Sequence, residues 1–85
     1  MEYSLYILQS LNHNKFYVGI SSNPERRLEF HNTIEKGFTS RYRPWRIVFV
    51  KKCDSKSTAL QLERKVKSWK SKKMIQKLID KEISL

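Results

Sequence analysis

The chain has 85 residues and a formal net charge of +10, from 18 lysines and arginines against 8 acidic residues. This length accommodates a single domain, residues 1–85, and leaves no room for a second folded unit. Aromatic residues make up 12% of the chain, which favours a globular fold over a disordered chain. The positive charge predicts a polyanionic partner, either nucleic acid or an anionic membrane surface.

The apolar segments and the cysteine content bear on the compartment of the protein. No apolar stretch approaches the roughly 18 residues that span a bilayer, and no signal-peptide pattern opens the chain. The single cysteine, Cys53, cannot form an internal disulfide and has no metal-ligand spacing, so we expect a small reduced thiol. We therefore expect a cytoplasmic protein without a membrane partner.

Two short segments near the amino terminus have the composition of β-strands. Residues 3–9 and 15–20 are rich in aromatic and β-branched side chains, which favour strands. The linker between them contains Ser and Asn and is turn-prone. We therefore predict an antiparallel hairpin.

A helix is predicted to follow the hairpin. Asn23 can accept a hydrogen bond from a free N–H of the first turn, and Pro24 fits the first helical position. Glu25 lies in the first turn, where the helix dipole favours a negative charge. We expect this helix to run to about Lys36 and to end at Gly37 in the left-handed conformation.

The second half of the chain predicts one more strand and two more helices. Residues 38–44 are expected to form a basic loop, and residues 45–52 a third strand that is buried on both faces. A helix should begin near Ser57, and Ser71 should cap a last helix. Their apolar sides are formed by Ala59, Leu62, Val66 and Trp69, and by Met74, Ile75, Leu78 and Ile79. The predicted fold is α+β, a small, mainly antiparallel three-stranded sheet flanked by helices in the order ββαβαα.

Five short motifs occur along nearly the whole chain. In order they are Ser4-Leu5-Tyr6, Tyr17-Val18-Gly19, Glu25-Arg26-Arg27-Leu28 with His31-Asn32, Arg43-Pro44-Trp45, and Ala59-Leu60-Gln61-Leu62-Glu63. Together they resemble the GIY-YIG nuclease superfamily. The likeness is greatest to its small stand-alone bacterial members and to the catalytic domain of an endonuclease that cuts branched DNA. In the first motif, Ser4 and Leu5 replace the glycine and isoleucine of the family name, whereas Tyr6 is retained.

Arg27 and His31 are four residues apart and therefore share one face of the first predicted helix. A fixed guanidinium can donate two parallel hydrogen bonds to a phosphate, on which negative charge builds during phosphoryl transfer. By themselves the two residues are equally compatible with a solvated pair on a basic helix. The resemblance implies that Arg27 contacts the scissile phosphate and that His31 aids proton transfer.

Tyr6 and Tyr17 alternate with apolar neighbours, so each is compatible with a half-buried strand tyrosine. The resemblance implies instead that both hydroxyls converge at the active site. Because a free tyrosine has a pKa of about 10, it is a poor base at neutral pH and needs a helping group. We assign Tyr17 to activation of the attacking water and Tyr6 to positioning.

Glu63 lies at the border of the apolar side of the second predicted helix, about 100° from Leu62 and 60° from Val66. An exposed, salt-bridged glutamate is one interpretation. The resemblance implies the other, in which Glu63 is the single protein ligand of Mg²⁺ or Mn²⁺, with water and phosphate as the remaining ligands.

The resemblance thus implies a metal-dependent endonuclease that hydrolyses DNA phosphodiester bonds. Its expected substrate is branched or flap DNA, and its expected role is in DNA repair or recombination. Its predicted catalytic residues are Tyr6, Tyr17, Arg27, His31 and Glu63, and we expect them on one face of the sheet. The candidates for phosphate contacts are Lys15, Lys36, Arg41, Arg43 and Arg46. The late lysines, from Lys65 to Lys81, either extend this surface or form a solvated helix face.

Two other functions remain open at this point. A non-catalytic nucleic-acid-binding module on the same fold would also be strongly basic, and would bind DNA with a marked salt dependence. A basic protein–protein adaptor is the third interpretation. The sequence leaves open the physiological substrate, a targeting partner subunit and the oligomeric state.

Overall fold

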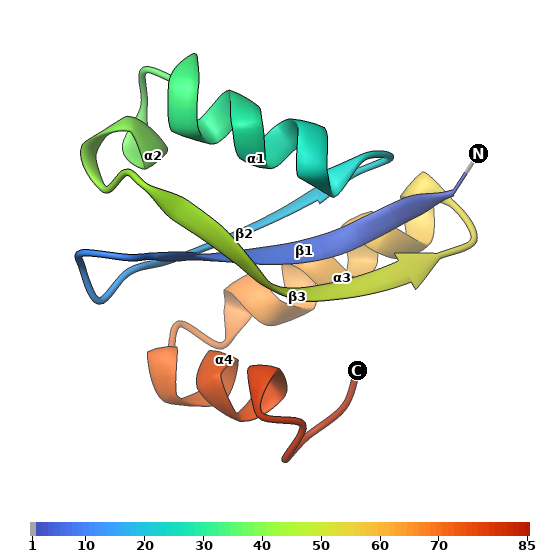
Figure 1. The fold of residues 1–85 in the computed structure, drawn as a ribbon. Helices are drawn as coiled ribbons and strands as arrows, with labels where there is room; N and C mark the ends of the chain where they lie inside the picture. Colours follow the sequence, from blue (N-terminus) through green and yellow to red (C-terminus); the bar gives the residue numbers. More distant parts are fainter. Residues whose placement is uncertain (1) are drawn as a thin grey trace.

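A three-stranded antiparallel sheet lies between two groups of helices in the computed structural model, which describes residues 2–85 (Figure 1). The elements in chain order are β1 (Tyr3–Ser10), β2 (Phe16–Ser21), α1 (Pro24–Thr33), α2 (Phe38–Arg41), β3 (Trp45–Cys53), α3 (Lys56–Ser68) and α4 (Lys72–Ile79). Helices α1 and α2 lie on one side of the sheet, and α3 and α4 on the other (Figure 1). Apart from the short α2, this order confirms the predicted ββαβαα fold.

Strand β1 occupies the centre of the sheet, because the strand order is β2-β1-β3 and both pairings are antiparallel. Its side chains alternate between two cores. Leu5 and Ile7 pack with residues of α3 and α4, whereas Tyr6 and Leu8 pack on the side of α1. A central strand buries both of its faces, which explains the nearly continuous apolar run.

Strand β3 lies at one edge of the sheet, so the prediction that it is buried on both faces is wrong. Trp45 and Cys53 at its ends are buried, but residues 50–52 are exposed. The apolar run of residues 47–50 resembles that of a central strand, and sequence pattern alone does not separate the two positions.

Helix α1 begins as predicted and ends earlier. Asn23 Oδ1 accepts the N–H of Arg26 at 3.1 Å, and Pro24 occupies the first turn. The helix ends at Thr33, and Gly37 has a φ of −89°, so the predicted left-handed termination at Gly37 is wrong. Instead, Glu35 Oε1 accepts the backbone N–H groups of residues 36 and 37, which turns the chain into α2. Helix α2 therefore replaces part of the predicted loop.

Helices α3 and α4 cover the second core. Ser55, two residues before the predicted start, caps α3 by accepting the N–H of Thr58, and Ser71 caps α4 as predicted. Their buried residues Val66 and Leu78 join the cluster formed by β1 and β2. Across residues 2–85, no helix has the length and apolar character needed to cross a bilayer.

Candidate active site

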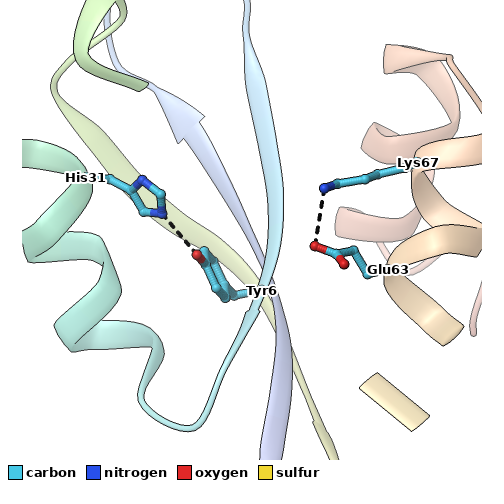
Figure 2. Close-up of polar contacts among 4 residues, drawn as sticks. All are labelled: Tyr6, His31, Glu63 and Lys67. Atoms are coloured by element: carbon cyan, nitrogen blue, oxygen red, sulfur yellow. Dashed lines mark hydrogen bonds and ion pairs between the residues drawn. The ribbon is translucent and has the colours of Figure 1, made fainter. Parts of the chain in front are cut away.

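A hydrogen-bonded pair of Tyr6 and His31 lies at the centre of the site. The Oη atom of Tyr6, on β1, is 3.0 Å from Nε2 of His31, on α1 (Figure 2). Both residues are only 1% exposed. A polar pair this deeply buried must be hydrogen bonded to be tolerated, so each residue fixes the orientation of the other.

His31 is held by further contacts on its other sides. Its Nδ1 atom is 3.1 Å from Oγ1 of Thr39, on α2. Its backbone carbonyl accepts the Nε–H of Arg43 at 2.7 Å. The ring of Tyr17, on β2, packs against the imidazole with a centroid separation of 4.6 Å. The imidazole is thereby fixed in both position and orientation.

The surroundings keep both members of the pair uncharged near neutral pH. Burial raises the pKa of the Tyr6 phenol, an effect that the neighbouring Arg27 opposes. Burial, and then the positive charge of Arg27, lower the pKa of His31. The site therefore holds an intact phenol against a neutral imidazole, which is able to accept a proton.

Tyr17 and Gly19 belong to the same motif and line the pair from β2. The rings of Tyr17 and Tyr6 have centroids 6.4 Å apart, and Tyr17 is half-buried. Gly19 is the register partner of Tyr6 across the sheet. A Cβ atom at Gly19 would lie 2.7 Å from Tyr6 Oη and 2.8 Å from its Cζ. Glycine is therefore required there for the phenol to occupy its position.

Arg27 lies on the same face of the sheet, one helical turn before His31. Its guanidinium stacks over the ring of Phe30, 4.3 Å from the ring centroid. Its charge acts on both Tyr6 and His31, which places it beside the pair. A surface hollow of about 500 Å³ runs along α1 and is lined by Arg26, Arg27, Glu29, Phe30 and Ile34. Of the five predicted catalytic residues, Arg27 alone lines this hollow.

Glu63 comes from α3 and lies across the strands from the Tyr6–His31 pair (Figure 2). Its Oε2 atom is 3.2 Å from Nζ of Lys67, and the two side chains are 18% and 53% exposed. The charge of Glu63 contributes to raising the pKa of Tyr6, so the carboxylate is within electrostatic range of the phenol. Four of the five predicted catalytic residues thus lie together on one face of the sheet. Glu63 faces them from the other helical layer, so the expectation of a single sheet face is wrong for this residue.

No cluster of three or more His, Cys, Asp or Glu side chains suitable for a metal ion occurs among residues 2–85. A metal site built on Glu63 would have one protein carboxylate, and the metal role of Glu63 stays a prediction.

The candidates for phosphate contacts differ in whether their side chains are exposed or already have partners within the protein. Lys36, Arg41 and Arg46 are exposed, although Arg46 also donates to Gln9 Oε1 at 3.2 Å. Lys15 lies 5.4 Å from the ring centroid of Tyr42. Arg43 is engaged within the protein, because it donates from Nε to the carbonyl of His31 and from Nη2 to the carbonyl of Glu35. Arg43 therefore stabilises the carboxyl end of α1, and its phosphate contact stays a prediction.

Sequence reasoning assigned no supporting role to three residues that stabilise the site, Asn32, Thr39 and Trp45. Asn32 exchanges two hydrogen bonds with the backbone of Trp45, accepting at 2.7 Å and donating at 3.1 Å. The indole Nε1 of Trp45 donates to the carbonyl of Thr39 at 2.7 Å. The motifs His31-Asn32 and Arg43-Pro44-Trp45 did mark part of this network. Thr39 carried no such signal, because its role depends on a contact between helices.

Comparison with known proteins gives the family. A family model described as the GIY-YIG catalytic domain matches residues 2–77. The chain belongs to the GIY-YIG catalytic domain family. The resemblance recognised from the five motifs is thereby confirmed.

The GIY-YIG domain is also similar to parts of longer fungal proteins and to one small bacterial protein. It is 44% identical over 68 residues to the structure-specific endonuclease subunit SLX1 of Chaetomium globosum, covering 72% of this chain and 21% of that protein. The corresponding protein of Phaeosphaeria nodorum is 40% identical over 67 residues, with 72% and 18% covered. The chain thus spans about a fifth of the length of these relatives.

The solution structure of a UPF0213 protein from Bacillus halodurans has the same fold. It superimposes with a TM-score of 0.59 at 27% identity, over 94% of this chain and 84% of that one. The match covers most of both chains, which therefore share this arrangement of strands and helices. It confirms the predicted α+β architecture.

Proposed function

We propose that this domain is a divalent-metal-dependent endonuclease that hydrolyses phosphodiester bonds in DNA. The observation that carries the proposal is the hydrogen-bonded Tyr6–His31 pair, which lies with Tyr17 and Arg27 on one face of the sheet. Membership of a catalytic domain family supports it. The net charge of +10 supports a polyanionic substrate.

In this proposal Arg27 binds the scissile phosphate. The stack on Phe30 holds the planar guanidinium, whose edges remain able to donate two parallel hydrogen bonds to phosphate oxygens. Because negative charge builds on those oxygens in the transition state, the contact strengthens as the reaction proceeds. Removing one such stabiliser typically lowers the rate by about 10²–10³.

Tyr17 contacts and orients the attacking water, because it is half-buried whereas Tyr6 is 1% exposed. A phenol with a pKa of about 10 does not hold the water's proton well at neutral pH, so the proton needs a further acceptor. Neutral His31 is that acceptor. The proton reaches it through Tyr6, whose oxygen accepts it while the phenol passes its own proton to Nε2.

The residues present fit a magnesium or manganese ion held by Glu63. The carboxylate is partly exposed and pairs with Lys67 through Oε2, so its other oxygen remains able to bind a cation. Mg²⁺ often uses only one or two protein carboxylates and keeps water and substrate phosphate as other ligands. When bound, such an ion would supply Lewis-acid stabilisation of the leaving 3′-oxygen, consistent with 3′-hydroxyl and 5′-phosphate products.

We propose that the substrate is branched or flap DNA. We further propose that the domain acts in DNA repair or recombination and is located in the cytoplasm. The fungal relatives support the proposed substrate, since they are named structure-specific endonuclease subunits. An 85-residue domain also has little surface for reading sequence through base contacts. The word subunit in those names supports a partner protein that targets the domain.

The test is a nicking assay on flap, branched and duplex DNA with Mg²⁺ or Mn²⁺. We expect cleavage of the flap and branched substrates, a loss of about 10²–10³ for Arg27→Ala, and comparable losses for Tyr17→Phe and Glu63→Ala. Folding of each variant is checked by its urea unfolding midpoint. Cleavage that is unchanged in a folded Glu63→Ala protein would falsify the metal role. Tyr6→Phe should also lower the rate, because Tyr6 carries the proton to His31, whereas an unchanged rate in a folded Tyr17→Phe protein would exclude Tyr17 as the phenol that orients the water.

One observation favours a second candidate function, a non-catalytic DNA-binding module. Tyr6 and His31 are both almost fully buried and bond to each other, and Glu63 is paired with Lys67. In a binding module these contacts serve only stability. Salt-dependent DNA binding without products at any metal concentration would establish this function.

A further inference from the structure

Helix α2 brings one buried polar side chain to His31. Thr39 is 1% exposed, and its Oγ1 atom lies 3.1 Å from Nδ1 of the imidazole. The same residue's carbonyl accepts the indole N–H of Trp45 at 2.7 Å. The backbone of Thr39 is therefore anchored by Trp45 independently of its hydroxyl group. The hydroxyl is available for a role of its own.

A neutral imidazole carries one N–H donor and one acceptor nitrogen, so its two partners decide its tautomer. Tyr6 meets Nε2 and Thr39 meets Nδ1. A phenol is a stronger acid than an aliphatic alcohol, so the Tyr6 O–H is the better donor to the imidazole acceptor nitrogen. With Nε2 accepting from Tyr6, the proton of the imidazole lies on Nδ1 and is donated to Thr39 Oγ1.

We propose that Thr39 is a positioning residue that holds His31 in the Nδ1–H tautomer, so that Nε2 is kept as the acceptor of the Tyr6 proton. Without the hydroxyl, the buried Nδ1–H would have no acceptor, which is unfavourable. The opposite tautomer then gains population, because its Nε2–H can donate to Tyr6 Oη. In that tautomer Nε2 can no longer take the proton of the phenol. The catalytic consequence rests on the proposed function, whereas the tautomer is a property of the free protein.

The test compares Thr39→Val, which has nearly the same shape without the hydroxyl, with Thr39→Ser, which keeps the hydroxyl. The nitrogen-15 chemical shifts of the His31 ring report the tautomer directly. We expect the Nδ1–H pattern in the wild-type and Thr39→Ser proteins, and a shift towards Nε2–H in Thr39→Val. Ser40→Ala, which removes a neighbouring hydroxyl that donates to the carbonyl of Gly37, should keep the wild-type pattern.

Cleavage kinetics give the second measurement. We expect kcat to fall about tenfold in Thr39→Val with KM nearly unchanged, and to recover in Thr39→Ser, as for the loss of one buried hydrogen bond. Should Thr39→Val fail to fold, Thr39→Ala takes its place, with the same expected tautomer shift.

Three results would overturn the proposal. They are an Nε2–H pattern in the wild-type protein, an unchanged Nδ1–H pattern in the folded Val or Ala variant, and equal losses of kcat in Thr39→Ser and Thr39→Val. If the wild-type protein cleaves no DNA, the proposed function fails. The ring shifts still decide whether Thr39 sets the tautomer.

Discussion

The Tyr6 hydroxyl that bonds to His31 has no room for an additional atom beside Gly19. The phenol lies against Gly19, where an added Cβ atom would come within 2.7 Å of Oη and 3.1 Å of Tyr17 Cε2. Overpacking of this kind forces side chains away from their preferred rotamers. The glycine of the second motif is therefore required by the site, in addition to any role in the strand.

Gly19→Ala is expected to destabilise the protein by about 1–3 kcal/mol and to displace the Tyr6 hydroxyl from His31. Urea unfolding measures the first effect, and the His31 ring nitrogen shifts measure the second. Gly37→Ala is the matched control, because its Cβ would meet only the flexible carboxylate of Glu35, at 3.2 Å. If both variants have wild-type stability and ring shifts, the close contact at Gly19 does not constrain the site.

The depressed pKa of His31 predicts a pH dependence of stability. Burial and Arg27 lower this pKa below the usual histidine value of about 6.5, Arg43 also lowers it, and Glu35 raises it. The phenols that face the imidazole are those of Tyr6 and Tyr17. Below pH 6.5 the unfolded chain therefore takes up a proton that the folded chain does not. The contribution of neutral His31 to stability is present above that pH and is lost as the pH falls towards the folded-state pKa.

Urea titrations between pH 8 and pH 5 should show stability falling below about pH 6.5 in the wild-type protein. In His31→Gln this part of the slope should disappear. His13→Gln, at an exposed hairpin position, controls for the loss of a histidine. An identical slope in the His31 variant would mean that this imidazole titrates alike in the folded and unfolded chains.

At the scale of elements, residues of α2, of the segment after it and of the start of β3 stabilise the carboxyl end of α1. Arg43 donates to two carbonyls at the end of α1, and Asn32 pairs with the backbone of Trp45. Thr39 completes the link through the Trp45 indole. This network thus supports the position of His31.

Elements set by local chemistry were predictable from the sequence, and elements set by distant contacts were not. Asn23 and Ser71 cap their helices through their own neighbours in sequence, and both were predicted. The end of α1 depends on Glu35 and on Arg43, which comes from beyond α2. The edge position of β3 depends on strand pairing, which its apolar run does not reveal.

Helix α3 presents Glu63 together with Lys67, its neighbour one turn later, at 3.2 Å. The Lys67 ammonium pairs with the carboxylate to which we assign the metal ion, so the ammonium and the metal ion compete for Glu63. An exposed pair of this type contributes about 0.2–1 kcal/mol. Lys67→Gln should therefore tighten Mn²⁺ binding about two- to fivefold.

Water-proton relaxation measures Mn²⁺ binding without any need for DNA. Lys65→Gln removes the same charge from another exposed residue of α3, whose backbone carbonyl accepts the hydroxyl of Ser68. It should have a smaller effect than Lys67→Gln, and Glu63→Gln should abolish the binding. Equal effects of the two lysine variants would indicate general electrostatics in place of competition at Glu63.

For the whole molecule, the sheet separates two layers of functional groups. Tyr6, Tyr17, Arg27 and His31 lie on the side of α1, and Glu63 lies on the side of α3. Four of the five motifs carry these residues, and the third motif carries both Arg27 and His31. The expectation of a single sheet face is wrong for Glu63, since the face on which α3 packs depends on tertiary contacts that the motifs do not reveal.

The same separation applies to the basic surface and gives a prediction for DNA binding. The exposed residues Arg26, Lys36 and Arg41 lie in α1, just after it and in α2, whereas Lys70, Lys72 and Lys73 lie where α3 meets α4 on the opposite side of the sheet (Figure 1). If phosphates are bound beside Arg27, the first set contacts DNA directly. The second set then acts only at long range, where salt screens it.

Two triple glutamine variants, each lacking three positive charges, separate these roles. Each phosphate contact contributes about −0.9 to the slope of log affinity against log salt. Replacing Arg26, Lys36 and Arg41 should therefore reduce the magnitude of the slope by about 2–3, and replacing Lys70, Lys72 and Lys73 should leave it nearly unchanged. Fluorescence anisotropy with flap DNA at 50–300 mM salt and with Ca²⁺ measures both. The reverse order would place the substrate on the lysine surface of α3 and α4, away from Arg27.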